Sequence, residues 1–393
     1  MAFLTEEDRR YTTPEDICAH VGDEYAKFMG AIVPPIFQNS LFVRPNGGNG
    51  LPADLSYSYT RSANPTIEVA ERKIAALEGA DGALCFSSGM GAISSAILHF
   101  VRANCHIVLV DTAYACTLGF VKEYLHGRFN MEYTLVNGGS VEEISAAIRP
   151  DTRLIYLESP SSLVFRMQDL EAIAALARAK GIGTVIDNSY ATPLYQQPLR
   201  HGIDIVCHTA SKYLGGHSDI VAGVLAARRE IIESIQNYER AWLGSSMDPH
   251  QASLLTRGLR TLTVRVPQHA ANAEKVAAWL EACPKIRQVF YPGSKTYAQN
   301  ELFHKYMKRA TGLLSFVPAG TREDAMRFAA RLHCFQNGCS WGGFESLCLP
   351  LGGDEASRAA GRPDNLVRMY VGLENVDTLI ADIEQAAGIL PDA

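Results

Sequence analysis

Long apolar segments are absent from this chain of 393 residues. No run of about eighteen apolar residues occurs, so the sequence predicts no membrane-spanning helix. Residues 1–8 (MAFLTEED) are acidic and lack the basic and apolar regions of a secretory signal. Internal repeats and low-complexity segments are also absent. We therefore expect a globular protein of the cytoplasm.

Cysteine pairs of the C-x-x-C type are absent, although the chain has nine cysteines. Scattered single cysteines predict neither a zinc site nor a disulfide framework, and they favour reduced thiols. An excess of basic residues is absent too, since the net charge is −6, so neither nucleic acid nor an anionic membrane is indicated as a partner. With 47% apolar and 20% charged residues, the composition is that of an ordinary soluble enzyme with two or three domains.

Short apolar runs alternate with helical stretches between residues 80 and 230. This alternation predicts an α/β fold, in which a mostly parallel, doubly wound sheet has helices on both faces. Ligands of such sheets bind at the carboxyl ends of the strands. The predicted strands are 83–86, 106–110, 132–136, 153–157, 184–186, 203–206 and 221–226, and the predicted helices are 89–102, 115–126, 141–148, 168–180 and 192–200.

The segments on either side of this region differ from it. Residues 1–60 are rich in proline and glycine and predict an irregular arm. Asn64 and Pro65 then predict the start of a helix that ends at Gly79. Residues 229–285 predict long helices with an interruption at 257–262. A smaller α+β domain follows, so the expected units are 1–60, 61–256 and 257–393, with late strands at 288–291, 312–316 and 366–370 and late helices at 323–333 and 375–388.

A lysine lies between two apolar runs, 203–206 and 220–227. Lys212 follows Thr209 and Ser211, whose hydroxyls can bond a phosphate while the amine reaches a carbonyl. This pattern is typical of a Schiff-base lysine beside a cofactor phosphate. The alternative is a solvated loop lysine.

Asp187 ends another apolar run, 25 residues before Lys212. A carboxylate at this position can pair with a pyridinium nitrogen and keep the ring protonated. The alternative is an aspartate that caps a helix or a turn. Together, Asp187 and Lys212 point to pyridoxal 5′-phosphate (PLP).

Two further strand ends carry candidate cofactor contacts. Gly89 and Met90 lie in a small-residue turn before a helix, where free N–H groups and the helix dipole favour an anion. Tyr114 follows the strand at 106–110 and could lie flat on a cofactor ring. An ordinary half-buried aromatic is the alternative for Tyr114.

The outer segments add three candidates. Arg368 lies in a buried-looking strand and needs a carboxylate partner, which could be a ligand or an internal salt bridge. Tyr59 and Arg61 precede the helix that starts at Asn64, where a plain surface loop is the alternative.

Taken together and in their order along the chain, these segments resemble the Cys/Met-metabolism family of PLP enzymes, which is the cystathionine lyase and synthase group of fold type I. The match runs from about residue 57 to 390, and its likeness is greatest to the bacterial cystathionine β-lyases. It is carried by these segments: 158–160 (ESP), 212–219 (KYLGGHSD), 257–262 (RGLRTL), 340–343 (SWGG) and 372–374 (GLE).

The resemblance implies a role for each candidate residue. Lys212 would form the Schiff base and act as general base, Asp187 would pair with the ring nitrogen, and Tyr114 would stack on the ring and assist proton transfer. The phosphate would be bound by Gly89, Met90, Thr209 and Ser211, and by Tyr59 and Arg61 of a neighbouring subunit. The substrate would be bound by Ser340 and Arg368, which would hold its α-carboxylate, and by Tyr59.

The family likeness also implies an oligomer and a reaction. The arm 1–60 would reach a neighbouring subunit of a homotetramer built from two dimers. The expected reaction is β-elimination of cystathionine, or of a related cysteine S-conjugate, to a thiol such as homocysteine, pyruvate and ammonia. Ser162, Cys339 and Trp341 favour this branch, whereas Cys116 and the segment 59–66 resemble the γ-acting branch.

Other activities stay open on the sequence alone. A methionine γ-lyase, an O-acylhomoserine sulfhydrylase or a cystathionine γ-synthase would use the same residues. An aminotransferase would also use PLP. A regulator that carries PLP and turns over poorly is the non-enzymatic alternative. No metal site is expected.

Overall fold

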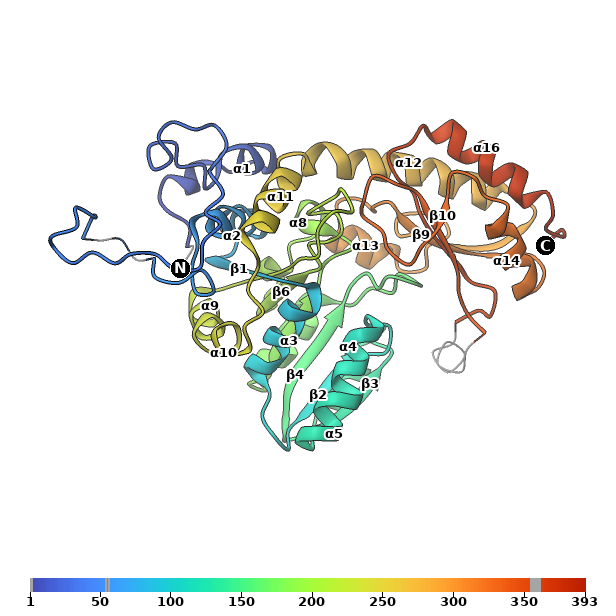
Figure 1. Cartoon of the computed structure of the whole chain (residues 1–393). Helices are drawn as coiled ribbons and strands as arrows, with labels where there is room; N and C mark the ends of the chain where they lie inside the picture. Colours follow the sequence, from blue (N-terminus) through green and yellow to red (C-terminus); the bar gives the residue numbers. More distant parts are fainter. Residues whose placement is uncertain (1–2, 54, 56, 354–361) are drawn as a thin grey trace.

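The computed structural model of the chain describes residues 3–53, 55, 57–353 and 362–393. Its strands form two sheets, which lie side by side in an elongated molecule (Figure 1). The first described residue, Phe3, pairs with Gly82 of the first sheet, and the C-terminus lies near the second sheet. The predicted arm (1–60) and small domain (257–393) each include a few residues outside the described ones.

The first sheet has seven strands in the order β1-β7-β6-β5-β4-β2-β3. Neighbours from β6 to β3 run parallel, whereas β7 is antiparallel to both β6 and β1. Most of these strands are buried along their whole length, as expected when helices cover both faces. The predicted α/β fold with a mostly parallel sheet is confirmed. The strands are β1 Gly82–Phe86, β2 His106–Val110, β3 Glu132–Val136, β4 Thr152–Glu158, β5 Gly183–Asp187, β6 Ile205–His208 and β7 Gly223–Ala227.

The helix α2 begins and ends at its sequence signals. The Asn64 side chain accepts the N–H of Thr66 at 2.9 Å, and Pro65 is the first helical residue. Gly79 has φ of 66° and ends the helix in the left-handed region, as predicted. The helices around the first sheet are α1 Pro14–His20, α2 Pro65–Glu78, α3 Gly89–Phe100, α4 Ala115–Gly119, α5 His126–Phe129, α6 Val141–Ala147, α7 Leu170–Ala179, α9 Arg229–Ile235 and α10 Ala241–Leu243.

The helix predicted at 192–200 is wrong as a single element. The chain forms α8 (Thr192–Tyr195), leaves the helical region at Gln196, and resumes as a 3-10 turn at Pro198–His201. Proline lacks an N–H and disfavours a helical conformation in the residue before it, so the helix cannot continue through Pro198. The stretch predicted at 115–126 also contains a wider π-helical turn, Phe120–Leu125, between α4 and α5.

The second sheet has the order β10-β11-β12-β9-β8. Helices α11 and α12 meet at Thr261, so the predicted interruption within 257–262 is confirmed. The short strands β10 and β11 were not predicted, and a domain division at 256/257 remains a prediction. The elements are α11 Pro249–Arg260, α12 Leu262–Ala282, β8 Ile286–Phe290, α13 Asn300–Tyr306, β9 Leu313–Pro318, α14 Arg322–Ala330, β10 Gln336–Asn337, β11 Leu347–Pro350, β12 Val367–Tyr370 and α16 Val376–Ala387.

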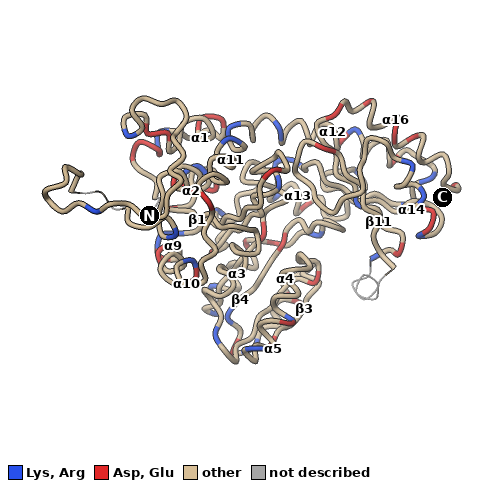
Figure 2. The backbone as a smooth tube through the Cα atoms, in the orientation of Figure 1, with Lys and Arg blue, Asp and Glu red and all other residues tan. Residues whose placement is uncertain are grey.

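Charged residues of both signs are spread along the whole chain rather than gathered in one segment (Figure 2). Within the described part of the chain, no helix is long and apolar enough to cross a membrane.

The fold brings several polar side chains to one edge of the first sheet. Strands β4, β5 and β6 are parallel neighbours, so their carboxyl ends lie together, at Glu158, Asp187 and His208. The loop after β6 carries Lys212, and α3 begins just after β1 at Gly89. This is the edge at which ligands of such sheets bind.

Candidate active site

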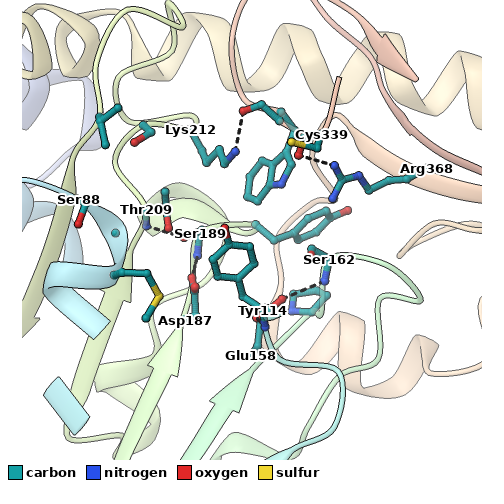
Figure 3. A pocket seen from close by; sticks show the side chains of 18 residues that line it. Ser88, Tyr114, Glu158, Ser162, Asp187, Ser189, Thr209, Lys212, Cys339 and Arg368 are labelled. Atoms are coloured by element: carbon teal, nitrogen blue, oxygen red, sulfur yellow. Dashed lines mark hydrogen bonds between the residues drawn. The ribbon is translucent and has the colours of Figure 1, made fainter. Parts of the chain in front are cut away.

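A cavity of about 350 Å³ opens at this edge, between the two sheets (Figure 3). Both sheets supply its walls. Its lining residues are Ser88, Gly89, Met90, Tyr114, Glu158, Pro160, Ser162, Asp187, Ser189, Tyr190, Thr209, Ser211, Lys212, Val221, Cys339, Ser340, Trp341 and Arg368.

Lys212 projects into the cavity and is not a solvated loop lysine. Its Nζ atom donates to the Oγ atom of Ser340 at 2.7 Å and lies 5.3 Å from the centre of the Trp341 ring. Burial lowers the pKa of this amine to about 8, and the positive charge of Arg368 contributes to the shift. A larger fraction of the amine is therefore unprotonated, and so nucleophilic, near neutral pH than for an ordinary lysine.

A buried arginine holds the backbone next to Lys212. Both terminal nitrogens of Arg265, on α12, donate to the carbonyl of Tyr213 at 3.0 Å. The loop turns at Gly216, which has φ of 73°, and a Cβ atom there would overlap the Arg265 guanidinium. The position of Lys212 is thus fixed from the second half of the chain.

Asp187 is buried at the end of β5 and faces the cavity (Figure 3). Its Oδ1 atom accepts the N–H of Ser189 at 2.9 Å, so it also serves as the turn aspartate that the alternative interpretation expected. Burial raises the pKa of this carboxyl. Ser189 in turn accepts the N–H of Thr209 at 2.7 Å and links the ends of β5 and β6. Ser189 was not predicted, although its place two residues after Asp187 was the available signal.

The start of α3 forms a cradle for an anion. Ser88 caps the helix by accepting the N–H of Gly91 at 3.0 Å, which leaves the N–H groups of Gly89 and Met90 without a partner inside the helix. A Cβ atom at Gly89 would lie 2.5 Å from Oγ1 of Thr209, so only glycine allows this close approach. Thr209 and Ser211 line the same part of the cavity. The four residues predicted to bind a phosphate are therefore brought together.

Tyr114 is half-exposed, at 48%, and its ring lines the cavity. A hydrogen bond with the Cys116 thiol, together with burial, raises the pKa of its hydroxyl to about 12. The hydroxyl is therefore protonated at neutral pH and can donate a proton.

Glu158 is a buried cavity residue to which the sequence interpretation gave no role. Its Oε2 atom accepts the N–H of Tyr114 at 2.7 Å, and its Oε1 atom accepts the N–H of Ser162 at 3.1 Å. Burial, and then the nearby Asp187, raises the pKa of this carboxyl to about 8. The motif at 158–160 was a signal of family likeness, but it did not reveal these contacts.

The second sheet contributes Ser340 and Arg368 to the cavity. Arg368 donates from Nη2 to the carbonyl of Cys339 at 2.6 Å. Within the described part of the chain no carboxylate forms an ion pair with Arg368, so the internal salt bridge considered for it is wrong. Its guanidinium remains available for an external carboxylate.

Tyr59 and Arg61 do not line this cavity within one chain. Tyr59 is 44% exposed, and the Arg61 guanidinium lies 5.5 Å from its ring. Arg61 also donates to the carbonyl of Ala241. Their predicted place at the phosphate therefore depends on a second subunit.

The cavity suits PLP on its own chemistry. A nucleophilic amine, a buried carboxylate for a ring nitrogen and a glycine-lined anion cradle occupy three sides of one space. No group of three or more metal-ligating side chains occurs among the residues that the structure describes.

Comparisons with known proteins agree with this chemistry. The family model for Cys/Met metabolism PLP-dependent enzymes matches residues 15–387. L-Methionine γ-lyase of Pseudomonas putida is 35% identical, over 93% of this chain and 95% of that protein. Cystathionine β-lyase of Lactococcus lactis subsp. cremoris is 36% identical, over 93% of this chain and 97% of that protein.

The fold agrees as well. The crystal structure of metB from Corynebacterium glutamicum matches with a TM-score of 0.91 and 35% identity, and covers 96% of this chain and 98% of that one. The predicted fold type I architecture and PLP dependence are thereby confirmed. The chain belongs to the PLP-dependent enzyme family of cysteine and methionine metabolism.

Proposed function

We propose that this enzyme is a carbon–sulfur lyase that catalyses β-elimination of cystathionine, or of a related cysteine S-conjugate. One observation carries the proposal. The Lys212 amine lies between the Ser340 hydroxyl and the Trp341 ring, in the same cavity as Asp187. A base held in one place suits proton removal from Cα followed by loss of a thiolate from Cβ.

PLP would be held by Lys212, by Asp187 at the ring nitrogen and by the cradle at Gly89 and Thr209, and it would supply an electron sink for the charge that develops at Cα. Lys212 then removes the Cα proton. Asp187 would pair with the ring nitrogen and favour its protonated form. Lys212 or Tyr114 donates a proton to the departing sulfur, and water converts the remaining three-carbon fragment to pyruvate and ammonia.

Arg368 and Ser340 bind the α-carboxylate of the substrate in this proposal. The guanidinium can make two parallel hydrogen bonds to a carboxylate. Because its Nη2 atom is already anchored to the Cys339 carbonyl at 2.6 Å, the side chain is held in one orientation before substrate binds.

A second subunit completes the site. Tyr59 and Arg61 are exposed in one chain and would bind the cofactor phosphate of a neighbour, with Tyr59 also near its substrate. This favours a dimer in which each site is shared across the interface, and the pairing of two such dimers into the expected homotetramer rests on the family likeness alone. All nine cysteines are free thiols, which favours the cytoplasm.

A methionine γ-lyase is the second candidate, because the exposed Cys116 lies beside Tyr114 and several relatives bear that name. Trp341 argues for the β-lyase. Its ring lies next to the Lys212 amine and limits the movement that proton transfers at Cα, Cβ and Cγ would require. A sulfhydrylase or a synthase would need an acylated homoserine as substrate.

Product analysis tests the proposal. In separate reactions, the PLP-loaded protein is incubated with cystathionine, with cystine, with methionine, and with O-acetylhomoserine together with cysteine. We expect pyruvate from cystathionine at the highest kcat/KM. Formation of 2-oxobutyrate as the main keto acid would favour the γ-lyase instead. A new thioether would indicate a synthase, PLP converted to its amine form would indicate an aminotransferase, and no turnover with bound PLP would favour a regulator.

A further inference from the structure

A single buried carboxylate joins two walls of the cavity. Glu158 lies at the end of β4, directly beside Asp187 in the sheet register, and is 6% exposed. One of its oxygens accepts the N–H of Tyr114 and the other accepts the N–H of Ser162 (Figure 3). These amides belong to separate loops, one after β2 and one after β4.

This arrangement costs stability. A buried carboxylate is normally paired with a cation, because its transfer out of water is unfavourable. Among the residues that the structure describes, no lysine, arginine or histidine forms an ion pair with Glu158. The neighbouring carboxyl of Asp187 adds repulsion, and the pKa of Glu158 is raised accordingly. A buried acid whose pKa is raised inside a cavity is typical of functional sites.

The backbone of Tyr114 is held on both sides: its carbonyl accepts the N–H groups of Thr117 and Leu118, and its N–H donates to Glu158. Tyr114 precedes α4 with φ of −50° and ψ of 133°, and its side chain makes no capping bond to that helix. Its ring is half-exposed in the cavity. The contact with Glu158, at 2.7 Å, is therefore the side-chain contact that fixes the backbone from which the ring projects.

We infer that Glu158 is a positioning residue: its carboxylate sets the Tyr114 ring and the Ser162 loop against the cofactor ring. This inference rests on one part of the proposed function, the binding of PLP in the cavity. The role of Glu158 would be the same in β-elimination and in γ-elimination. The carboxylate form is needed, because it can accept from two amides at once with its two oxygens, whereas an amide side chain has one acceptor oxygen. Since the pKa of Glu158 is raised to about 8, this form predominates above pH 8, and the test below is made there.

The Glu158→Gln variant tests this inference. The glutamine oxygen can accept one amide, but its NH₂ group cannot accept the other. We expect PLP to bind with its usual visible absorbance, because Lys212 and Asp187 are unchanged. The circular dichroism of the bound PLP should weaken as the ring contact loosens. The value of kcat should fall about 10- to 100-fold, with KM changed less than about threefold, since misplacement of a catalytic group acts mainly on the chemical step.

Asp382 provides a matched control. It is also buried, and its oxygens accept the N–H groups of His333 and Cys334, but it lies in α16, outside the cavity lining. Asp382→Asn should lower the melting temperature and leave kcat and the dichroism unchanged. If Glu158→Gln is insoluble, Glu158→Asp carries the same test, because the side chain is one methylene shorter and its oxygens can no longer reach both amides.

A double-mutant cycle identifies the partner of Glu158. In a Tyr114→Ala background, Glu158→Gln should lower kcat by less than about twofold, because coupled residues are not additive. Wild-type dichroism and kcat in Glu158→Gln, or fully additive losses in the cycle, would overturn the inference. A wild-type protein that binds PLP but eliminates no thiol would contradict the proposed function alone, because the dichroism would still test Glu158.

Discussion

The Nζ atom of Lys212 lies 2.7 Å from the Oγ atom of Ser340. The lysine follows β6 of the first sheet, and the serine belongs to the loop between β10 and β11 of the second sheet. This hydrogen bond therefore spans the cavity and connects its two halves. It also means that the hydroxyl can hold the amine whenever the amine is not bound to cofactor.

The attachment of PLP should depend on the protonation of Lys212. Its pKa is lowered to about 8, so the amine is mainly protonated and unreactive below pH 8 and mainly free above it. The rate at which cofactor-free protein gains the visible PLP absorbance should rise with pH, with a midpoint near pH 8, and level off about one pH unit higher. Arg368→Met removes a nearby positive charge and should move the midpoint upward. A wild-type rate that still rises steeply through pH 10 would contradict the lowered pKa.

Replacement of Asp187 by asparagine should impair chemistry more than cofactor binding. The neutral amide cannot stabilise a protonated ring nitrogen, and loss of a charged hydrogen bond costs about 1.5–3 kcal/mol, or about 10- to 100-fold in kcat. Titration with PLP should show retained binding through Lys212. Asp204→Asn is the control, because Asp204 lies near the opposite, amino-terminal end of β6. Unchanged kcat in Asp187→Asn would remove this residue from the mechanism.

Arg368→Lys should weaken substrate binding. A lysine keeps the charge but cannot hold the Cys339 carbonyl and a carboxylate in the same planar arrangement. We expect KM for cystathionine to rise about tenfold or more, with a smaller change in kcat. Arg327→Lys, at an exposed position of α14, should change neither constant. A rise in KM of similar size in both variants would argue against the carboxylate contact.

Trp341 should control which bond is broken. Trp341→Leu gives the Lys212 amine more room and should raise the ratio of 2-oxobutyrate from methionine to pyruvate from cystathionine. A change of about tenfold corresponds to the 1–3 kcal/mol that a pocket contact usually contributes to specificity. Trp279→Leu, on α12 and away from the cavity lining, serves as the control. An unchanged ratio in Trp341→Leu would remove the argument for β-elimination that rests on this ring.

Much of the first sheet could be predicted because its strands are short buried runs between helices. The strands at 106–110 and 132–136 have their predicted bounds, and the caps of α2 act as their residue types indicate. By contrast, β10 and β11 were missed, since short strands carry little periodic signal. The helix expected at 192–200 was interrupted by the local effect of Pro198.

Site residues could be predicted where their residue type is unusual for its position in the sequence. They were harder to predict where their role depends on a contact with a residue elsewhere in the fold. A lysine and an aspartate after buried strands indicated Lys212 and Asp187. Glu158 was not assigned a role, because its partners are backbone amides, which every residue except proline carries. Arg265 on α12, which bonds the backbone of the Lys212 loop, was missed because a contact between residues far apart in the sequence leaves no local pattern.

Chemical labelling of the cofactor lysine tests the central claim most directly. Holoenzyme is treated with borohydride, which fixes PLP to the lysine that bears it, and the labelled peptide is then identified by mass spectrometry. We expect the label on Lys212, and no label in Lys212→Ala, while Lys275→Ala, at an exposed position of α12, keeps it. A label on any other lysine, or wild-type turnover in Lys212→Ala, would contradict the account.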